Sequence, residues 1–242
     1  MKLKFMDNLS KGHLHIVTQA IRNISLIFND IGFTVVSGPE LETEFYNFDA
    51  LNIPIDHPAR DMQDTLWLKT KPGEEKKVLR THTSSVQIRF MESMRANPRP
   101  AKIIVPGRVY RNEATDMTHE AQFYQLEGLY LNSRVSMTEL KGVLEYFFRE
   151  FIGSEAKIRF RPSYFAFVEP GVEVDVWWKG GWLEMFGAGI VHPSVIKSAG
   201  LDPRTWKGFA FGGGIDRLIL LRHGIDDIRR LYLGDLRLVN QF

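Results

Sequence analysis

Residues 106–128, PGRVYRNEATDMTHEAQFYQLEG, predict two antiparallel strands joined by a long polar loop. The first strand, residues 102–111, is rich in the β-branched and aromatic residues that favour strands: Ile103, Ile104, Val105, Val109 and Tyr110. The second strand, residues 122–131, alternates, so side chains two residues apart lie on the same face of the sheet. Phe123, Gln125 and Glu127 are therefore predicted to share one face, and Tyr124 and Leu126 to share the other.

The face that carries the aromatic, the amide and the carboxylate could bind a flat base, a phosphate and an ammonium group. The partner strand adds Arg108 and Arg111, whose fixed fork of donors suits phosphate. The alternative is a solvated sheet face whose polar side chains have no function. The hairpin alone leaves both interpretations open.

Composition narrows the class of protein. The chain has 242 residues, enough for one large or two small domains, and 44% of them are hydrophobic and 25% charged, as in an ordinary folded protein. The net charge of +2, from 31 basic and 29 acidic residues, does not indicate a nucleic-acid binder, although local basic patches remain possible. The absence of cysteine excludes disulfides, thiolate nucleophiles and cysteine-ligated zinc.

The same sequence gives no sign of membrane insertion or secretion. No apolar run approaches the ~20 residues of a membrane span. The first residues, MKLKFMDNLSKGHLH, lack the apolar segment of a signal peptide. We therefore expect a cytoplasmic protein without a membrane association.

Apolar periodicity predicts the remaining elements. A helix is expected over 12–31, ended by Gly32, with an apolar stripe broad enough for burial against a sheet or another subunit. Further helices are expected over 85–95, after the capping box Ser136-x-x-Glu139, and from about 214 to 222. Further strands are expected over 33–36, 65–68, 77–80, 157–161, 171–178, 182–192 and 209–212. This pattern predicts one α+β domain built on an antiparallel sheet.

Three shorter segments carry candidate site residues. His82 and Ser84 in THTSS would share one face if they end a strand, and Glu184 and Phe186 are expected on one face of theirs. In PSYFAFVEP, residues 162–170, Phe165 and Phe167 could present ring edges to one side. In GFAFGGGIDR, residues 208–217, glycines allow close backbone approach ahead of a helix whose first turn carries Arg217. This last segment matches neither the Walker A nor the Rossmann pattern, so those two modes of nucleotide binding are excluded.

Taken together, these segments resemble class II aminoacyl-tRNA synthetases, specifically the catalytic α subunits of bacterial-type phenylalanyl-tRNA synthetases. The resemblance spans residues 12–242 and rests on GPELET (38–43), YNFDALNIPIDHPARDMQDT (46–65), LRTHTSSVQ (79–87), PGRVYRNEATDMTHEAQFYQLEG (106–128), RFRPSYFAFVEPG (159–171), GFAFGGGIDRLILL (208–221) and RHGIDDIR (222–229). It implies the class II antiparallel sheet flanked by helices, in a single catalytic domain over 1–242 with 1–11 as a short extension.

The resemblance also implies an ATP site. Arg111 matches the arginine of class II motif 2 that holds the α-phosphate of ATP, and Phe123 matches the residue that stacks on adenine. Arg217 matches the motif 3 arginine on the opposite side of the adenine, near the phosphates. Glu113 and His119 match loop positions close to ATP. On this basis Arg111 and Arg217 are the expected catalytic residues.

A phenylalanine site and partners follow from the same resemblance. Gln125 and Glu127 correspond to the groups that bind the substrate ammonium, with His82 and Ser84 beside them. The ring would meet Phe165 and Phe167 over a floor made by Ala210 and Gly212. Glu169 matches a Mg²⁺ ligand shared with the β subunit, and Pro39 matches motif 1 at the dimer-forming edge. The implied assembly is an α2β2 heterotetramer that charges tRNA(Phe) with L-phenylalanine.

Two departures from the family pattern leave alternatives open. The family's α subunits begin with a coiled-coil arm that reaches tRNA, whereas about eleven residues precede the first predicted helix here, so this is either a shortened piece or a natural short form. Asp216 stands where motif 3 commonly has Glu. The alternatives are a catalytically idle paralogue that binds or regulates, and an adenylating enzyme whose acceptor is not tRNA.

Overall fold

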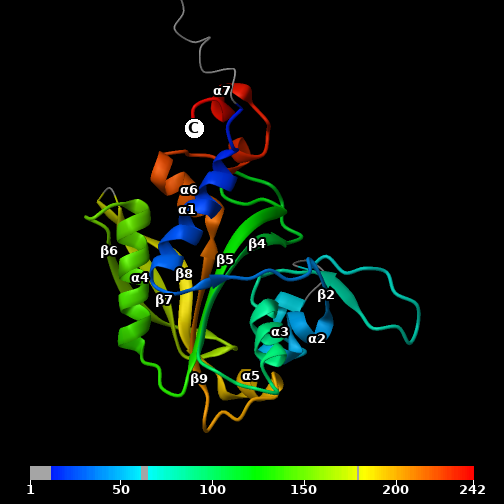
Figure 1. Cartoon of the computed structure of the whole chain (residues 1–242). Helices are drawn as coiled ribbons and strands as arrows, with labels where there is room; N and C mark the ends of the chain where they lie inside the picture. The colour runs from blue at the N-terminus through cyan, green and yellow to red at the C-terminus, as the bar shows by residue number, and fades with distance from the viewer. Residues whose placement is uncertain (1–11, 61–64, 179) are drawn as a thin grey trace, which may run out of the picture.

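A seven-stranded sheet with strand order β1–β4–β5–β9–β8–β7–β6 organises the protein (Figure 1). The computed structural model describes residues 12–60, 65–178 and 180–242, so the predicted extension 1–11 lies outside the described residues. The strands are β1 (Thr34–Val35), β4 (Ala101–Tyr110), β5 (Gln122–Asn132), β6 (Lys157–Phe165), β7 (Val168–Trp178), β8 (Gly181–Val191) and β9 (Lys207–Gly214). Every neighbouring pair is antiparallel except β1, which runs parallel to β4. The predicted α+β class, with a largely antiparallel sheet flanked by helices, is confirmed.

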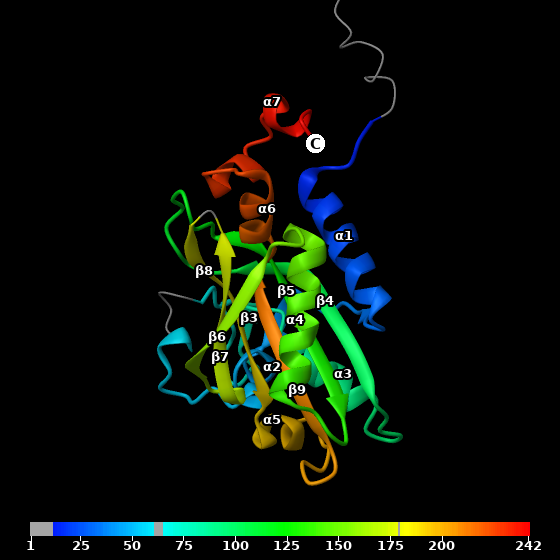
Figure 2. The ribbon, with the colours of Figure 1, turned by 90° about the vertical axis from the view of Figure 1, so that its left-hand side faces the viewer.

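Three helices, α1 (Ile16–Asp30), α4 (Met137–Ile152) and α6 (Ile215–His223), cover one face of this sheet (Figure 2). Their apolar stripes meet the even-numbered side chains of β5 and the phenylalanines of β9 in one core. The ring of Phe28 stacks on Phe147 at 4.8 Å and on Phe211 at 5.4 Å between centroids. Helix α1 begins at Ile16 rather than near residue 12, because the ring of His15 caps it by accepting the Val17 N–H.

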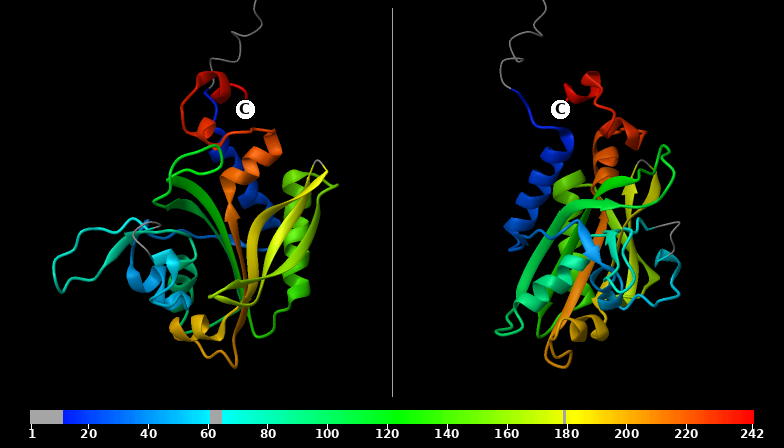
Figure 3. Two further views of the ribbon diagram at one scale, coloured as in Figure 1. Left: turned by 180° about the vertical axis from the view of Figure 1, so that it is seen from behind. Right: turned by 90° about the vertical axis from the view of Figure 1, so that its right-hand side faces the viewer.

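Short elements between residues 41 and 93 cover part of the opposite face (Figure 3). They are β2 (Leu41–Thr43), α2 (Glu44–Asn47), η1 (Asp49–Leu51), η2 (Pro58–Arg60), β3 (Lys77–Leu79) and α3 (Ser85–Ser93), and α5 (Pro193–Ser198) joins them. The predicted strand 65–68 is reduced to a single antiparallel bridge between Trp67 and Val78, and β3 forms its ladder with β2. Residues 61–64, within the segment 46–65 that carries part of the family resemblance, lie outside the described residues.

The expectation that Glu184 and Phe186 share a face is also wrong, because β8 contains a bulge. Asp175 pairs with Glu184 and Val174 with Phe186, so Met185 is an extra residue in the ladder. A bulge shifts the alternation by one residue. Phe186 consequently packs into the helix-covered core, whereas Glu184 lies within 3.6 Å of Arg161.

The C-terminal part of the chain returns to the start of α1. After α6, Gly224 takes a left-handed conformation, followed by η3 (Ile228–Leu231) and α7 (Leu236–Val239). Asn240 after α7 contacts His13, just before α1. Among the residues described, no helix is both long enough and apolar enough to cross a membrane.

Candidate active site

Two adjoining cavities lie against the face of β5 that carries the odd-numbered side chains. The first, of about 240 Å³, is lined by His82, Ser84, Arg111, Gln125, Glu127, Phe165, Phe167, Val168, Gly187, Ala188, Ala210, Phe211 and Gly212. The second, of about 510 Å³, is lined among others by Arg111, Glu113, Thr118, His119, Glu120, Phe123, Gln125, Glu184, Asp216, Arg217 and Ile228. Arg111 and Gln125 line both cavities, so the two adjoin at these side chains.

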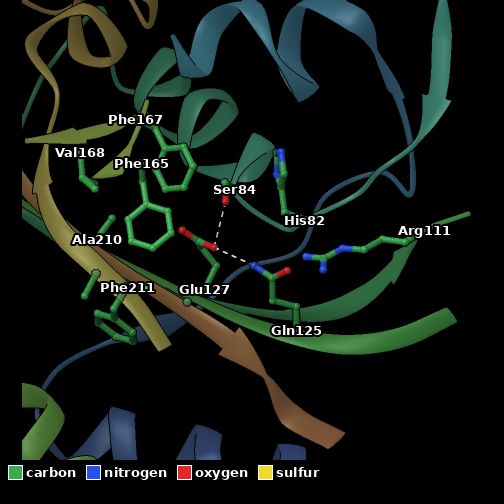
Figure 4. Close-up of a pocket in the computed structure, with 13 residues that line it drawn as sticks. His82, Ser84, Arg111, Gln125, Glu127, Phe165, Phe167, Val168, Ala210 and Phe211 are labelled. Atoms are coloured by element: carbon green, nitrogen blue, oxygen red, sulfur yellow. Dashed lines mark hydrogen bonds between the residues drawn. The ribbon is translucent and has the colours of Figure 1, made fainter. Parts of the chain in front are cut away.

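Glu127 forms the polar centre of the first cavity. Glu127 is 3% exposed, and its carboxylate accepts hydrogen bonds from Ser84 Oγ at 2.9 Å and from Gln125 Nε2 at 3.1 Å (Figure 4). A third hydrogen bond comes from Gln87 Nε2. Burial raises the pKa of Glu127 to about 8, and the three neutral donors oppose that rise only in part. Among the described residues, the groups that act on the Glu127 carboxylate are these three neutral donors and no cation, so the carboxylate is suited to a cationic group from a ligand.

His82 lies across the first cavity from Gln125 (Figure 4). Both of its ring nitrogens are shielded from solvent and have no hydrogen-bond partner among the described residues. Burial, helped by the positive charge of Arg111, lowers the pKa of His82 to about 4, so the ring is neutral at pH 7. Buried polar atoms without partners are rare in native proteins, and a bound polar ligand is one explanation. His82 lies on a bend and Ser84 at the residue that precedes α3, rather than on the tail of a strand, yet both line the cavity.

The other end of the first cavity is apolar. Phe165 ends β6 and Phe167 lies in the turn before β7, with ring centroids 5.9 Å apart and planes 29° apart. Gly187 allows Phe165 its position, because a Cβ there would lie 2.9 Å from Phe165 Cζ. Ala210 and Gly212 on β9, the expected floor residues, also line this cavity. The first cavity therefore combines an aromatic end with a buried carboxylate, a combination that fits an aromatic amine.

The second cavity brings together cations and an aromatic ring. The guanidinium of Arg111 lies 5.0 Å from the centroid of the Phe123 ring, and Arg217 extends from the first turn of α6. Glu113 and His119 line the cavity from the loop 111–121. His119 is held there by Asp116, whose carboxylate accepts its backbone N–H at 2.8 Å. Cations beside a half-buried aromatic ring in a cavity are suited to a nucleotide that carries phosphates.

Two sequence-derived expectations fall outside both cavities. Arg108 pairs across strands with Tyr124, and Val109 pairs with Phe123, so Arg108 lies on the opposite face from Phe123. Its guanidinium contacts Glu40 at 2.9 Å instead of lining a cavity. Glu169, the expected Mg²⁺ ligand, lines neither cavity; its exposed carboxylate lies 3.4 Å from His192 Nε2.

The sequence analysis did not single out Gln87 or Gly187. Gln87 is buried, donates to Glu127 and follows Ser84 by three residues at the start of α3, a spacing that places both on one helical face. A polar residue at that spacing from Ser84 was the available signal. Gly187 gave no signal, because the bulge that sets its direction depends on pairing with β7.

Comparison with known proteins agrees with this geometry. Residues 2–242 match the family model of the tRNA synthetases class II core domain (F). The chain is 50% identical over 231 residues to the phenylalanine–tRNA ligase alpha subunit of Prochlorococcus marinus, covering 96% of this chain and 66% of the relative. It is also 50% identical over 235 residues to the alpha subunits of Yersinia enterocolitica and Escherichia coli K12, covering 97% of this chain and 69% of each relative. The chain thus spans about two thirds of the length of these relatives. It belongs to the class II tRNA synthetase core family and, within it, to the phenylalanine–tRNA ligase alpha subunits.

Proposed function

We propose that this chain is the catalytic α subunit of a phenylalanine–tRNA ligase. It activates L-phenylalanine with ATP to give phenylalanyl-adenylate, and the phenylalanyl group then passes to tRNA(Phe). We assign this activity to one catalytic domain that spans the chain.

One observation carries the proposal. The residues expected to bind phenylalanine all line the first cavity, the residues expected to bind ATP all line the second, and the cavities meet at Arg111. The carboxylate of the amino acid and the α-phosphate of ATP must come within bonding distance for adenylate formation. A junction lined by a guanidinium suits that requirement, because both reacting groups are anionic.

Phenylalanine is proposed to bind with its ring against Phe165 and Phe167 over Ala210 and Gly212. An edge-to-face contact between rings is a preferred aromatic geometry. The ammonium group meets Glu127 and Gln125, with Ser84 and the neutral ring of His82 close by. The ammonium group thereby becomes the cationic partner of the buried Glu127 carboxylate.

ATP is proposed to stack its adenine on Phe123, with Arg217 on the other side of the base and Glu113 and His119 along the loop. The phenylalanine carboxylate attacks the α-phosphorus, a new P–O bond forms, and the bond to the β-phosphate oxygen breaks to release pyrophosphate. The carboxylate is already ionised at pH 7, so no side chain needs to remove a proton. Arg111, with Arg217, stabilises the negative charge that develops on the α-phosphate.

Mg²⁺ and the partner chain are part of the proposal. Within the residues that the structure describes, no group of three or more acidic or histidine side chains could hold a metal. Glu169 alone does not make a metal site, so we assign it as one ligand of a Mg²⁺ site completed by a β subunit, and no reaction step depends on it. An α2β2 assembly, with Pro39 at the α–α edge, and a cytoplasmic location follow from the same family.

Phenylalanine-dependent exchange of pyrophosphate into ATP tests the proposal. The chain mixed with its β subunit should exchange label only when L-phenylalanine is present, with reactions lacking phenylalanine as the control. Absence of phenylalanine-dependent exchange in the mixture would sink the proposal.

The two alternatives have less support. An idle paralogue is disfavoured because Arg111, Glu127 and Arg217 are all present in lined cavities and because the relatives are named as ligases. Calorimetry that detects binding of neither ATP nor phenylalanine would favour it. The possibility of a non-tRNA acceptor is tested by comparing transfer of the phenylalanyl group from the adenylate to tRNA(Phe) with its transfer to small amines.

A substitution at Gly212 tests the floor of the first cavity. A Cβ there would lie 2.6 Å from Glu127 Oε2 and 3.3 Å from Gln125 Nε2. Gly212→Ala should therefore displace the carboxylate and weaken phenylalanine binding about tenfold, since overpacking costs roughly 1–3 kcal/mol. Titration calorimetry with phenylalanine measures the change. Gly142→Ala, which adds a methyl group in open space on α4, is the control, and equal affinities for the two variants would contradict the prediction.

A further inference from the structure

The carboxylate of Asp216 joins the two elements that flank the second cavity. Asp216 is 1% exposed in the first turn of α6. Its Oδ2 accepts the backbone N–H of Tyr124 on β5 at 2.6 Å, and its Oδ1 accepts the hydroxyl of Tyr232. The side chain of Asp216, although one methylene shorter than Glu, thus reaches both partners.

The bond to Tyr124 continues a strand ladder that would otherwise end. Strand β9 pairs with β5 only as far as Gly214 opposite Gln125, after which the chain turns into α6. The N–H of Tyr124 therefore lies past the last β9 partner, and the carboxylate of Asp216 replaces the missing strand acceptor. Because Phe123 precedes Tyr124 and Arg217 follows Asp216, this bond fixes the distance between two side chains that line the second cavity.

Tyr232 brings the C-terminal segment into the same arrangement. It follows η3 and packs against the helix-side core, while Ile228 of η3 lines the second cavity and donates its N–H to Met117 O at 3.0 Å. Met117 belongs to the loop 111–121 that carries Glu113 and His119. The segment 228–232 therefore contacts the loop 111–121 through Ile228, and it contacts Asp216, the neighbour of Arg217, through Tyr232.

The hydroxyl of Tyr232 has an electrostatic role as well as a geometric one. Burial raises the pKa of Asp216, and the hydrogen bonds from Tyr232 and Tyr124 oppose that rise. Removal of the hydroxyl would leave a buried carboxylate oxygen without its donor, which is costly inside a protein. The carboxylate would then become neutral or move, and the bond to Tyr124 would weaken.

We propose that Tyr232 is a positioning residue for ATP, because through Asp216 it holds the Phe123 end of β5 and the Arg217 turn of α6 at the separation the nucleotide needs. The inference rests on the proposed function, since it assumes that ATP occupies the second cavity. Phenylalanine binds in the first cavity, at Gln125 and beyond, so its affinity should not depend on Tyr232.

Tyr232→Phe tests the inference in the chain assembled with its β subunit. We expect the KM for ATP in pyrophosphate exchange, and the Kd for ATP by calorimetry, to rise about tenfold, as for the loss of a hydrogen bond to a charged group. The KM for phenylalanine should stay within about twofold of the wild-type value. A purely structural role would lower thermal stability without separating the two KM values.

Tyr46→Phe is the matched control. Tyr46 on α2 also donates its hydroxyl to a carboxylate, Glu92 Oε2 at 2.8 Å, but it lines neither cavity. The control should lose stability without a change in ATP affinity. Equal ATP affinities for the two variants would overturn the role of Tyr232 and leave the proposed function standing. Equal losses of ATP and phenylalanine affinity in Tyr232→Phe would do the same. A wild-type assembly that binds no ATP would overturn the proposed function together with it.

Asp216→Asn provides a second route if Tyr232→Phe folds poorly. The amide retains one acceptor but turns an NH₂ group toward one of the two donors, so ATP affinity should again fall about tenfold. Adding Tyr232→Phe to this variant should change ATP affinity less than twofold, because residues that act through one another are not additive. Full additivity in this double-mutant cycle would show that the two residues act separately and would overturn the inference.

Discussion

Arg111→Ala should form phenylalanyl-adenylate about a thousandfold more slowly than the wild-type chain, the scale of losing a preorganised group that stabilises developing charge. Arg111 lines both cavities, so its guanidinium lies where the amino-acid carboxylate and the α-phosphate are proposed to meet. Its contact with the Phe123 ring means that the KM for ATP should also rise. Single-turnover formation of the adenylate separates the loss of rate from the loss of ATP binding.

Arg108→Ala is the control for Arg111→Ala. Arg108 is an arginine of the same hairpin, three residues away, but it lies on the other face of the sheet and pairs with Glu40. Its loss should leave adenylate formation within about threefold of wild type, because exposed ion pairs contribute little. Comparable rates for the two variants would contradict the assignment of Arg111.

Glu127→Gln should weaken phenylalanine binding about a hundredfold at pH 7.5, because loss of one partner of a buried charge pair costs roughly 2–5 kcal/mol. The amide keeps the size of the side chain but removes the negative charge that is proposed to meet the substrate ammonium. Titration calorimetry with phenylalanine measures the loss. Glu145→Gln, which alters an exposed pair with Lys141 on α4, should leave the affinity unchanged.

The raised pKa of Glu127 gives phenylalanine binding a characteristic pH dependence. With a pKa of about 8, the carboxylate is mostly protonated at pH 7, and an ammonium group binds the ionised form. Affinity should therefore fall about tenfold per pH unit from pH 7.5 to 6, with a proton released on binding. His82 stays neutral throughout this window, since its pKa is about 4. A flat profile in the wild type, or the same slope in Glu127→Gln, would contradict the role of Glu127.

The same shift also affects stability without ligand. Because the folded protein holds the Glu127 proton more tightly than the unfolded chain, this group stabilises the fold below pH ~4.5 and that contribution is lost as pH rises to about 8. The free energy of unfolding of wild type, compared with Glu127→Gln, should therefore fall over that range. Urea denaturation at several pH values measures the difference.

Local patterns in the sequence were sufficient for much of the fold. Apolar periodicity gave α1, α4 and α6, and strand alternation gave the pairing of β4 with β5. Both are properties of consecutive residues, so they need no knowledge of distant contacts. The errors lie where pairing between strands decides: the bulge at Met185, the face of Arg108 and the single bridge at Trp67.

The sequence by itself predicted many of the residues that line the two cavities, because alternation places Phe123, Gln125 and Glu127 on one face and the family motifs mark others. Only the tertiary structure decided how they work together: that Gln87 also donates to Glu127, that Gly187 makes room for Phe165, and that Asp216 anchors Tyr232. These contacts join residues 16 to 40 positions apart or depend on a bulged register, and their burial sets the pKa of Glu127. Local sequence fixes the direction of a side chain relative to its own strand or helix. Its partners and its burial are set only when the strands and helices pack together.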